Sequence, residues 1–144
     1  MQDKFLNYFM QCALSASKLS TCCRASVGCV VVSKDGRIIS TGYNGAPKGC
    51  SHCNEVGCYL DETGHCIRSV HAEANALLNV SRESLSGGTL FCTHKPCLNC
   101  TKLILNTGIV KVYYHYPYDS GRLASEMIAE RFETIVFSRI AVVH

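Results

Sequence analysis

The pattern of apolar and polar positions alternates between helical and extended spacing along the chain. Residues 4–18 carry apolar side chains at helical spacing, and an apolar, β-branched run over 27–32 predicts a strand. The Lys34-Asp35-Gly36 turn joins this run to residues 37–43 as a β-hairpin. Beyond residue 70 the pattern predicts helices over 72–79, 97–106 and 121–131 and strands over 89–93, 109–115 and 134–137.

A hairpin followed by alternating helices and strands is typical of an α/β domain. We expect a three-layer α/β/α arrangement around a mixed sheet of the five predicted strands. Strands that are joined through helices run parallel, so the parallel part of the sheet should be C-terminal. A length of 144 residues with 47% hydrophobic and 17% charged residues fits one folded domain over residues 1–144.

Charge and hydropathy exclude several classes of partner. The net charge is only +3 and tryptophan is absent, so the chain lacks the basic, aromatic-rich surface of a nucleic-acid binder. This charge is still compatible with a local basic pocket for one phosphate. No window approaches the roughly 20 apolar residues that span a bilayer. The N-terminal segment is interrupted by Asp3, Lys4, Asn7 and Gln11 and lacks a signal-peptide core. We expect neither a nucleic-acid nor a membrane partner.

Cysteine is the outlier of the composition. The chain has 11 cysteines, an odd number that does not favour a secreted disulfide framework. Cys12, Cys29 and Cys92 lie in apolar or helical contexts, where a thiol behaves as a small buried hydrophobe. The other cysteines cluster with histidines, which points to metal binding in a reducing compartment. We therefore expect a cytoplasmic protein, in the host cytoplasm if the chain is viral.

Residues 44–69 form a long segment without periodicity, interrupted by four glycines and one proline. A loop of this length in a compact domain is usually functional or is held by a bound group. Four cysteines and two histidines lie in it: Cys50, His52, Cys53, Cys58, His65 and Cys66. These residue types suggest that a metal ion orders the segment.

Two short motifs carry the chemistry. Cys97 and Cys100, three apart on a predicted helix that starts near Pro96, share one face and can bind one ion. His71 would complete a set of three ligands with an open fourth position, which is the catalytic form of a zinc site. His71 and Glu73 would diverge in mid-helix, so they can meet in one pocket only where a helix begins.

Glu73 indicates which reaction this metal site supports. A carboxylate beside the metal, but not bound to it, is placed to move protons. The combination H-x-E and P-C-x-x-C is the signature of zinc-dependent deaminases of nucleobases. A structural zinc clip or a redox pair would account for Cys97 and Cys100 alone, but neither accounts for Glu73.

Further motifs narrow the family. They are T-G-Y-N-G-A-P at 41–47, H-C at 52–53, G-C at 57–58, H-C-I-R at 65–68, H-A-E-A-N-A at 71–76 and T-H-K-P-C-L-N-C at 93–100. With these motifs the chain resembles the deoxycytidylate (dCMP) deaminases of the cytidine deaminase-like superfamily, from about Cys22 to Tyr118. The resemblance implies the cytidine deaminase-like fold and hydrolytic deamination of dCMP to dUMP, which feeds thymidylate synthesis.

The resemblance also implies a mechanism and a regulation. Zinc held by His71, Cys97 and Cys100 activates a water for attack on C4 of cytosine. Glu73 takes a proton from the water and passes protons to N3 and to the departing amine, releasing ammonia. Members of the family are commonly homo-oligomers, often hexamers, and many are activated by dCTP and inhibited by dTTP. Mg²⁺ would accompany a triphosphate effector.

Three residues are expected at the substrate. By resemblance Asn44 would hydrogen-bond the deoxyribose, although Asn-Gly is also an ordinary turn pair. Tyr118 could close over the base or sugar or simply pack. The 5′-phosphate requires a cation, for which Arg68 is the first candidate and Arg24 and Lys95 follow; each could equally be a solvated surface charge.

A second, structural zinc is expected in the long segment. Cys22, Cys53, His65 and Cys66 are the favoured ligands, with Cys58 as a substitute. The spacing matches no standard zinc-finger pattern, and unligated buried thiols are the alternative.

Two other functions stay open. A deaminase acting on dCTP, or on both nucleotides, would use the same chemistry, because the reaction at the base is blind to the number of phosphates. A zinc-stabilised binding module without turnover would make Glu73 dispensable.

Overall fold

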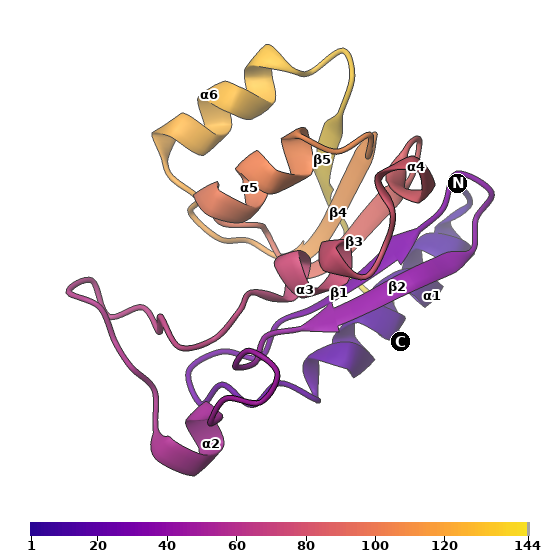
Figure 1. Ribbon diagram of the computed structural model, residues 1–144. Helices are drawn as coiled ribbons and strands as arrows, with labels where there is room; N and C mark the ends of the chain where they lie inside the picture. Colours follow the sequence, from indigo (N-terminus) through magenta and orange to yellow (C-terminus); the bar gives the residue numbers. More distant parts are fainter. Residues whose placement is uncertain (144) are drawn as a thin grey trace.

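The computed structural model describes residues 1–143, and the predicted domain extends one residue further to His144, which lies outside them. A five-stranded sheet in the order β2-β1-β3-β4-β5 runs through the molecule (Figure 1). The strands are β1 (Gly28–Val32), β2 (Ile38–Tyr43), β3 (Thr89–His94), β4 (Lys111–Tyr116) and β5 (Val136–Arg139). β1 pairs antiparallel with β2 and β3, whereas β3, β4 and β5 are parallel. The predicted mixed sheet with a C-terminal parallel part is confirmed.

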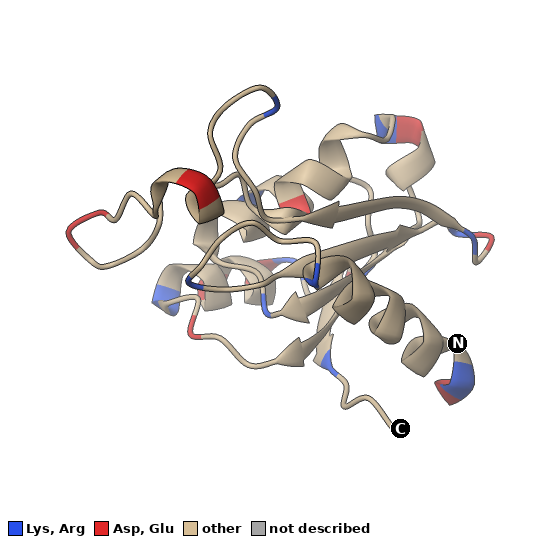
Figure 2. Ribbon diagram, turned by 90° about the horizontal axis from the view of Figure 1, so that it is seen from below, with Lys and Arg blue, Asp and Glu red and all other residues tan. Residues whose placement is uncertain are grey.

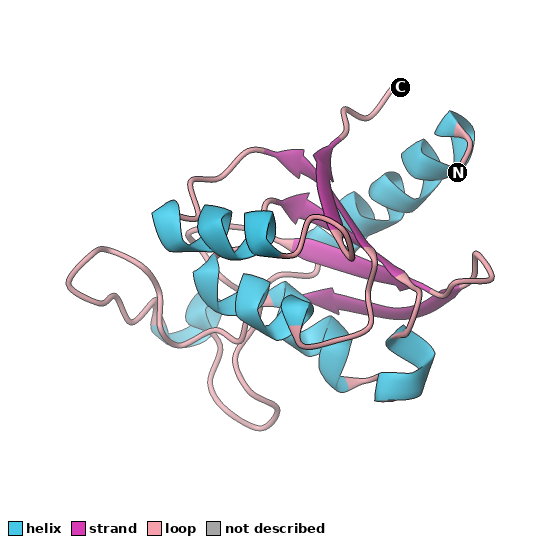
Figure 3. Cartoon of the chain, turned by 90° about the horizontal axis from the view of Figure 1, so that it is seen from above, coloured by secondary structure: helices cyan, strands magenta, loops and turns pink. Residues whose placement is uncertain are grey.

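Helices cover both faces of the sheet, as the α/β/α prediction requires (Figure 3). Helix α1 (Asp3–Ser17) packs on one face, against β1 and β3. The other face carries α3 (Ala72–Leu78), α5 (Leu98–Leu105) and α6 (Arg122–Glu130). Two four-residue helices, α2 (Cys53–Val56) and α4 (Arg82–Leu85), lie in segments for which the sequence pattern predicts no element.

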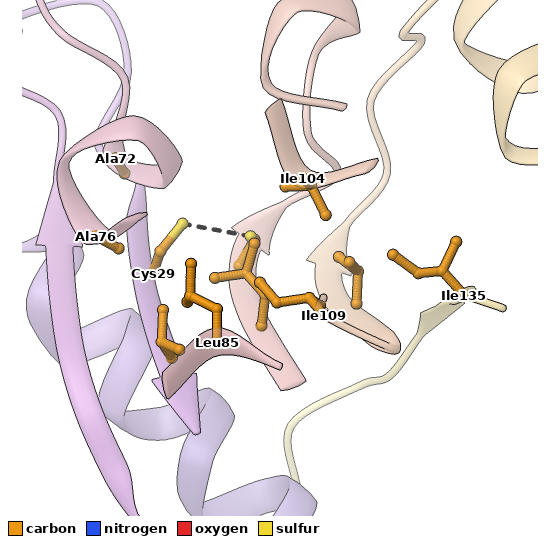
Figure 4. Close-up of a cluster of buried hydrophobic side chains, with 11 residues drawn as sticks. Cys29, Ala72, Ala76, Leu85, Ile104, Ile109 and Ile135 are labelled. Atoms are coloured by element: carbon orange, nitrogen blue, oxygen red, sulfur yellow. Dashed lines mark hydrogen bonds between the residues drawn. The ribbon is translucent and has the colours of Figure 1, made fainter. Parts of the chain in front are cut away.

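The core divides into two clusters because neighbouring residues of a strand point to opposite faces. All of β1 is buried. Val30 and Val32 pack with residues of α1, while Cys29 and Val31 pack on the side of α3 and α5 (Figure 4). This alternation places the thiol of Cys29 on the sheet face that carries α3, which begins directly after His71.

The last two strands begin later than the apolar pattern predicts. Ile109 and Ile135 are buried in the core but precede the first paired residues of β4 and β5. The pattern of apolar residues predicts which side chains are buried, not which residues pair in the sheet. Both isoleucines are buried before the backbone hydrogen bonds of their strands begin. The predicted elements are otherwise present, with boundaries that differ by one or two residues.

The surface agrees with the balanced composition. Lysine, arginine and acidic residues are scattered over the described chain rather than gathered by sign on one side (Figure 2). Among residues 1–143, none of the helices combines the length and the apolar character needed to cross a membrane. Residues 44–71 form a long loop that includes α2 and extends from the body of the molecule (Figure 1).

Candidate functional site

Helix α3 begins where the sequence motif requires it. His71 is the residue that precedes the helix, with an extended backbone (φ −68°, ψ 151°), and Glu73 lies in the first turn. The change from extended to helical backbone lets the two side chains approach the same cavity, as predicted from their spacing. Both residues line that cavity.

Three contacts fix α3 on the sheet. Gly42 of β2 lies so close to the helix that a Cβ there would be 2.4 Å from the Ala72 carbonyl oxygen. The Ser40 hydroxyl donates a 2.7 Å hydrogen bond to the carbonyl oxygen of Ala76. The Asn75 amide donates a 2.9 Å hydrogen bond to the carbonyl oxygen of Tyr43. The start of α3, and with it the position of His71 and Glu73, is therefore set by strand β2.

His71, Cys97 and Cys100 come together at the ends of two helices. Cys97 precedes α5 and Cys100 lies in its first turn. The His71 Nδ1 atom is 3.4 Å from the Cys97 Sγ and 3.3 Å from the Cys100 Sγ. A tetrahedral zinc with bonds of about 2.0–2.3 Å separates neighbouring ligand atoms by about 3.5–3.8 Å. Both nitrogen-to-sulfur distances lie within a few tenths of an ångström of this geometry, and all three ligand atoms lie within 4.8 Å of one another.

The charges of the three residues suit a cation. A hydrogen bond from Cys100, aided by His71, lowers the pKa of Cys97 to about 4, so Cys97 is a thiolate at neutral pH. The neighbouring Cys97 sulfur and burial raise the pKa of Cys100 well above its usual range. A thiolate beside a second thiol and an imidazole is the donor set that binds zinc by releasing a proton.

Glu73 is buried beside this cluster, with 4% of its surface exposed. Burial raises the pKa of its carboxyl group, which favours a group that can accept and return a proton. One carboxylate oxygen, Oε1, lies 3.3 Å from the Sγ atom of Cys29. Sequence reasoning treats Cys29 only as a core residue, because nothing in the local pattern shows which side chain it meets across the sheet.

A cavity of about 740 Å³ opens in front of these residues. Besides His71, Cys97 and Glu73, its wall includes polar and aromatic side chains of four separate segments: Arg24, Asn44, Asp61, His65, His94, Lys95, Asn99, Tyr118 and Asp119. This volume lies in the range of small-molecule sites. His94 lies in this wall as well, although its position in the T-H-K-P-C-L-N-C motif predicts no role for it.

Asn44 and Tyr118 lie in the cavity wall as expected of substrate contacts. The Asn44 side chain also holds the preceding loop: its Oδ1 accepts from the Val27 N–H at 2.9 Å, and its Nδ2 donates to the Ala25 carbonyl at 2.8 Å. Each amide atom can make one further hydrogen bond. The Tyr118 hydroxyl is 3.5 Å from the His65 Nε2 atom. The turn interpretation and the substrate interpretation of Asn44 are compatible.

The structure places Arg68, the first candidate for the phosphate, within the long loop and not in the cavity wall. Its Nε donates a 3.1 Å hydrogen bond to the Gly57 carbonyl, and its guanidinium lies 5.9 Å from the centroid of the Tyr59 ring. Arg68 thus ties together two parts of the long loop and is outside the cavity wall. The arginine and lysine of the wall are Arg24 and Lys95, the other two phosphate candidates predicted from the sequence.

A second group of potential metal ligands consists of four cysteines. The sulfur atoms of Cys22, Cys53, Cys58 and Cys66 all lie within 4.8 Å of one another. The Cys53 and Cys66 sulfurs are 3.6 Å apart. Four thiols are the complete ligand set of a closed structural zinc site. Cys58, expected only as a substitute, takes the place expected for His65.

A tight turn directs His65 away from that cluster. The Asp61 Oδ1 atom accepts hydrogen bonds from the backbone N–H groups of Thr63 and His65, both at 2.9 Å. Gly64 adopts a φ of 84°, a conformation that glycine reaches without strain. The His65 Nδ1 then lies 2.7 Å from the Thr63 hydroxyl, and its Nε2 faces Tyr118.

Comparison with known proteins agrees with this geometry. Residues 3–116 match the family model described as the cytidine and deoxycytidylate deaminase zinc-binding region. A deoxycytidylate deaminase of Mycobacterium phage D29 is 44% identical over 118 residues, covering 74% of this chain and 91% of the phage protein. ComE operon protein 2 of Bacillus subtilis is 38% identical over 130 residues, covering 89% of this chain and 68% of that protein.

A solved structure shares the whole fold. The crystal structure of dCMP deaminase from the cyanophage S-TIM5, in complex with dCMP and dUMP, superimposes with a TM-score of 0.79 at 34% identity. The match covers 97% of this chain and 99% of the cyanophage chain. By its sequence, its fold and the family model that spans residues 3–116, the chain belongs to the cytidine and deoxycytidylate deaminase family.

Proposed function

We propose that the chain is a zinc-dependent hydrolase that converts dCMP and water to dUMP and ammonia. The observation that carries this proposal is the position of Glu73. It is buried beside His71, Cys97 and Cys100, in the wall of a cavity large enough for a mononucleotide. The S-TIM5 enzyme of the same fold was crystallised with dCMP and dUMP, the substrate and product of this reaction.

His71 Nδ1 and the sulfur atoms of Cys97 and Cys100 would hold the zinc, leaving a fourth position open. When bound, the ion supplies a Lewis acid that makes water a nucleophile near neutral pH. Glu73 removes a proton from the attacking water and returns protons to N3 of the base and to the leaving amine. Proton transfer of this kind contributes on the order of 10²–10⁴-fold to the rate.

Substrate binding is assigned to the cavity wall. Asn44 retains one donor and one acceptor for the deoxyribose, and Tyr118 borders the same space. Arg24 and Lys95 are the cations that can meet the 5′-phosphate, which a charged hydrogen bond recognises best.

A second zinc, bound by Cys22, Cys53, Cys58 and Cys66, would order the loop around α2. It would join Cys22, in the segment after α1, to three cysteines of the long loop, which has little regular secondary structure. Such closed thiolate sites stabilise folding directly.

The finer properties follow from the family resemblance. We propose a single domain over residues 1–144 that assembles into a homo-oligomer, with a hexamer favoured, and acts in the cytoplasm. Activation by dCTP and inhibition by dTTP, with Mg²⁺ accompanying the triphosphate, complete the proposal.

Ammonia release by the zinc-loaded protein tests the proposal, with dCMP and dCTP each as substrate and with the other triphosphates added. Glu73→Gln keeps the shape of the side chain and should lower kcat at least about 100-fold while zinc content is retained. Glu133→Gln, at an exposed position after α6, is the matched control. Direct turnover of dCTP would favour the dCTP or dual enzyme. Full zinc occupancy with no ammonia from either nucleotide would favour the binding module.

A further inference from the structure

We propose that Cys29 is a positioning residue for Glu73: its thiol donates a hydrogen bond to one carboxylate oxygen and thereby holds the carboxyl group in the orientation needed for proton transfer. This inference rests on the proposed function, because it assigns to Cys29 a part in the orientation of the group that moves protons.

The contact is direct and isolated from water. The Cys29 Sγ lies 3.3 Å from the Glu73 Oε1, and Cys29 has no exposed surface. Distances of this length are normal for a hydrogen bond that involves sulfur, because sulfur is larger than oxygen. Glutamate has three rotatable side-chain bonds, so a carboxylate without a fixed partner would sample several orientations in the cavity wall.

The strand register places the thiol there. Cys29 lies in β1 with its side chain on the α3 face, and its direct partner in β3 is Cys92. Gly42 brings α3 close to the neighbouring strand, so Glu73 in the first turn reaches the side chain of Cys29. A cysteine of the sheet therefore contacts the carboxylate of a residue in the first turn of α3.

Burial keeps Cys29 a donor. Removal from water raises the pKa of the Cys29 thiol well above its usual range, and the nearby Cys92 adds to this effect. The Cys29 and Cys92 sulfurs are also 3.3 Å apart (Figure 4). A thiol has a single proton, and a carboxylate is a stronger acceptor than a thiol sulfur. We therefore assign the Cys29 proton to Glu73 and treat Cys92 as a packing neighbour.

Four variants separate positioning from packing. Cys29→Ala and Cys29→Val remove the donor, the first with a small cavity and the second with the volume filled. Cys29→Ser keeps a donor on the same Cβ. Cys92→Ala is the control, since it removes the same thiol from the same core at the directly paired position of β3. Measurements are kcat and KM for dCMP, zinc content, and the infrared S–H stretching band, which responds to hydrogen bonding.

The expected result is a fall in kcat of about tenfold for Cys29→Ala and Cys29→Val, equivalent to about 1.4 kcal/mol. KM and zinc content should stay near the wild-type values, and Cys29→Ser should recover part of the loss. In the infrared spectrum, the S–H stretching band of Cys29 is the band that is lost in Cys29→Ala. In Glu73→Ala this band should shift to higher frequency. Cys92→Ala should change kcat no more than about threefold.

Wild-type kcat in both Cys29→Ala and Cys29→Val would overturn the inference, and so would an S–H band that does not respond to Glu73→Ala. If kcat falls to the same extent in Cys29→Ser and Cys92→Ala, Cys29 contributes only to core packing. If the wild-type protein releases no ammonia from dCMP, the proposed function fails instead, while the infrared comparison still decides whether the hydrogen bond exists.

Discussion

The backbone of Gly42 faces the carbonyl oxygen of Ala72 at a separation that no other amino acid allows. A Cβ on Gly42 would lie 2.4 Å from that oxygen and 2.6 Å from the Ala76 nitrogen. Both are backbone atoms, which cannot rotate out of the way as a side chain could. Strand β2 and the helix that carries Glu73 are therefore in contact through a glycine.

We predict that Gly42→Ala impairs the site from a distance. The extra methyl group must push α3 away from β2, and overpacking of this kind costs about 1–3 kcal/mol of unfolding free energy. The displacement also moves His71 relative to Cys97, so zinc content and ammonia release should fall together. Chemical unfolding, metal analysis and the deaminase assay measure the three effects.

Gly36→Ala is the control for Gly42→Ala. Gly36 has a φ of 85° and open space where its Cβ would stand, in the hairpin turn between β1 and β2. Its substitution should cost only the backbone strain of about 1–2 kcal/mol, with zinc content and kcat unchanged. Equal loss of zinc in both variants would contradict the role assigned to Gly42.

The second prediction concerns the ligand set of the loop. Cys58→Ser should lower the zinc content by one ion per chain, since serine is a poor ligand for zinc and three thiols leave the site open. His65→Ala should retain that ion, because the His65 ring contacts Thr63 and Tyr118 instead of the cluster. Metal analysis of the purified proteins decides between them.

Cys23→Ser is the matched control for Cys58→Ser. Cys23 is exposed and adjoins Cys22 in the chain, but it is outside the four-sulfur cluster. Loss of zinc in His65→Ala with retention in Cys58→Ser would restore the ligand set that the sequence favours.

The sequence motifs locate the main site because both halves of it are local. His71 and Glu73 meet at the start of one helix, and Cys97 and Cys100 at the start of another, so spacing alone predicts each pair. The apolar pattern likewise predicts the helices and strands along the chain, and the helical connections predict which strands run parallel. Each of these features depends on residues within a few positions of one another.

Features of the long loop could not be predicted in the same way. Whether Cys58 or His65 lies beside the other three cysteines depends on the turn at Asp61. The side chain of Arg68 donates a hydrogen bond to the carbonyl group of Gly57, 11 positions earlier in the chain. Cys29 meets Glu73 through packing of a strand against a helix, across 44 positions. None of these contacts leaves a periodic signal in the sequence.

The third prediction concerns the phosphate. Arg24→Ala and Lys95→Ala should each raise KM for dCMP by about 5- to 50-fold, the range that loss of one charge-assisted hydrogen bond produces. Turnover of deoxycytidine, which lacks the phosphate, should hardly change. Steady-state kinetics with both substrates provide the measurement.

Arg68→Ala supplies the comparison for the two cavity cations. Because its guanidinium binds Gly57 and lies over Tyr59, we expect its loss to lower thermal stability and to leave KM for dCMP within about twofold of wild type. A large rise in KM confined to dCMP would return Arg68 to the phosphate site.

The last prediction concerns thiol reactivity after zinc removal. Burial opposes ionisation of Cys66, but backbone N–H groups of Arg68 and Tyr59 outweigh it and lower the pKa of Cys66 to about 6. The thiolate is the nucleophile, so at pH 7 Cys66 should be alkylated readily once zinc is removed, and the rate should fall as the pH drops through about 6. Burial raises the pKa of Cys53 to about 12 and excludes Cys29 and Cys92 from water, and the pKa of the buried Cys100 is also raised, so these four should react last. Brief treatment with iodoacetamide and mass analysis, before and after chelation, gives the order. Reaction of Cys66 at the same rate with zinc present, or without dependence on pH, would contradict its place in the metal cluster.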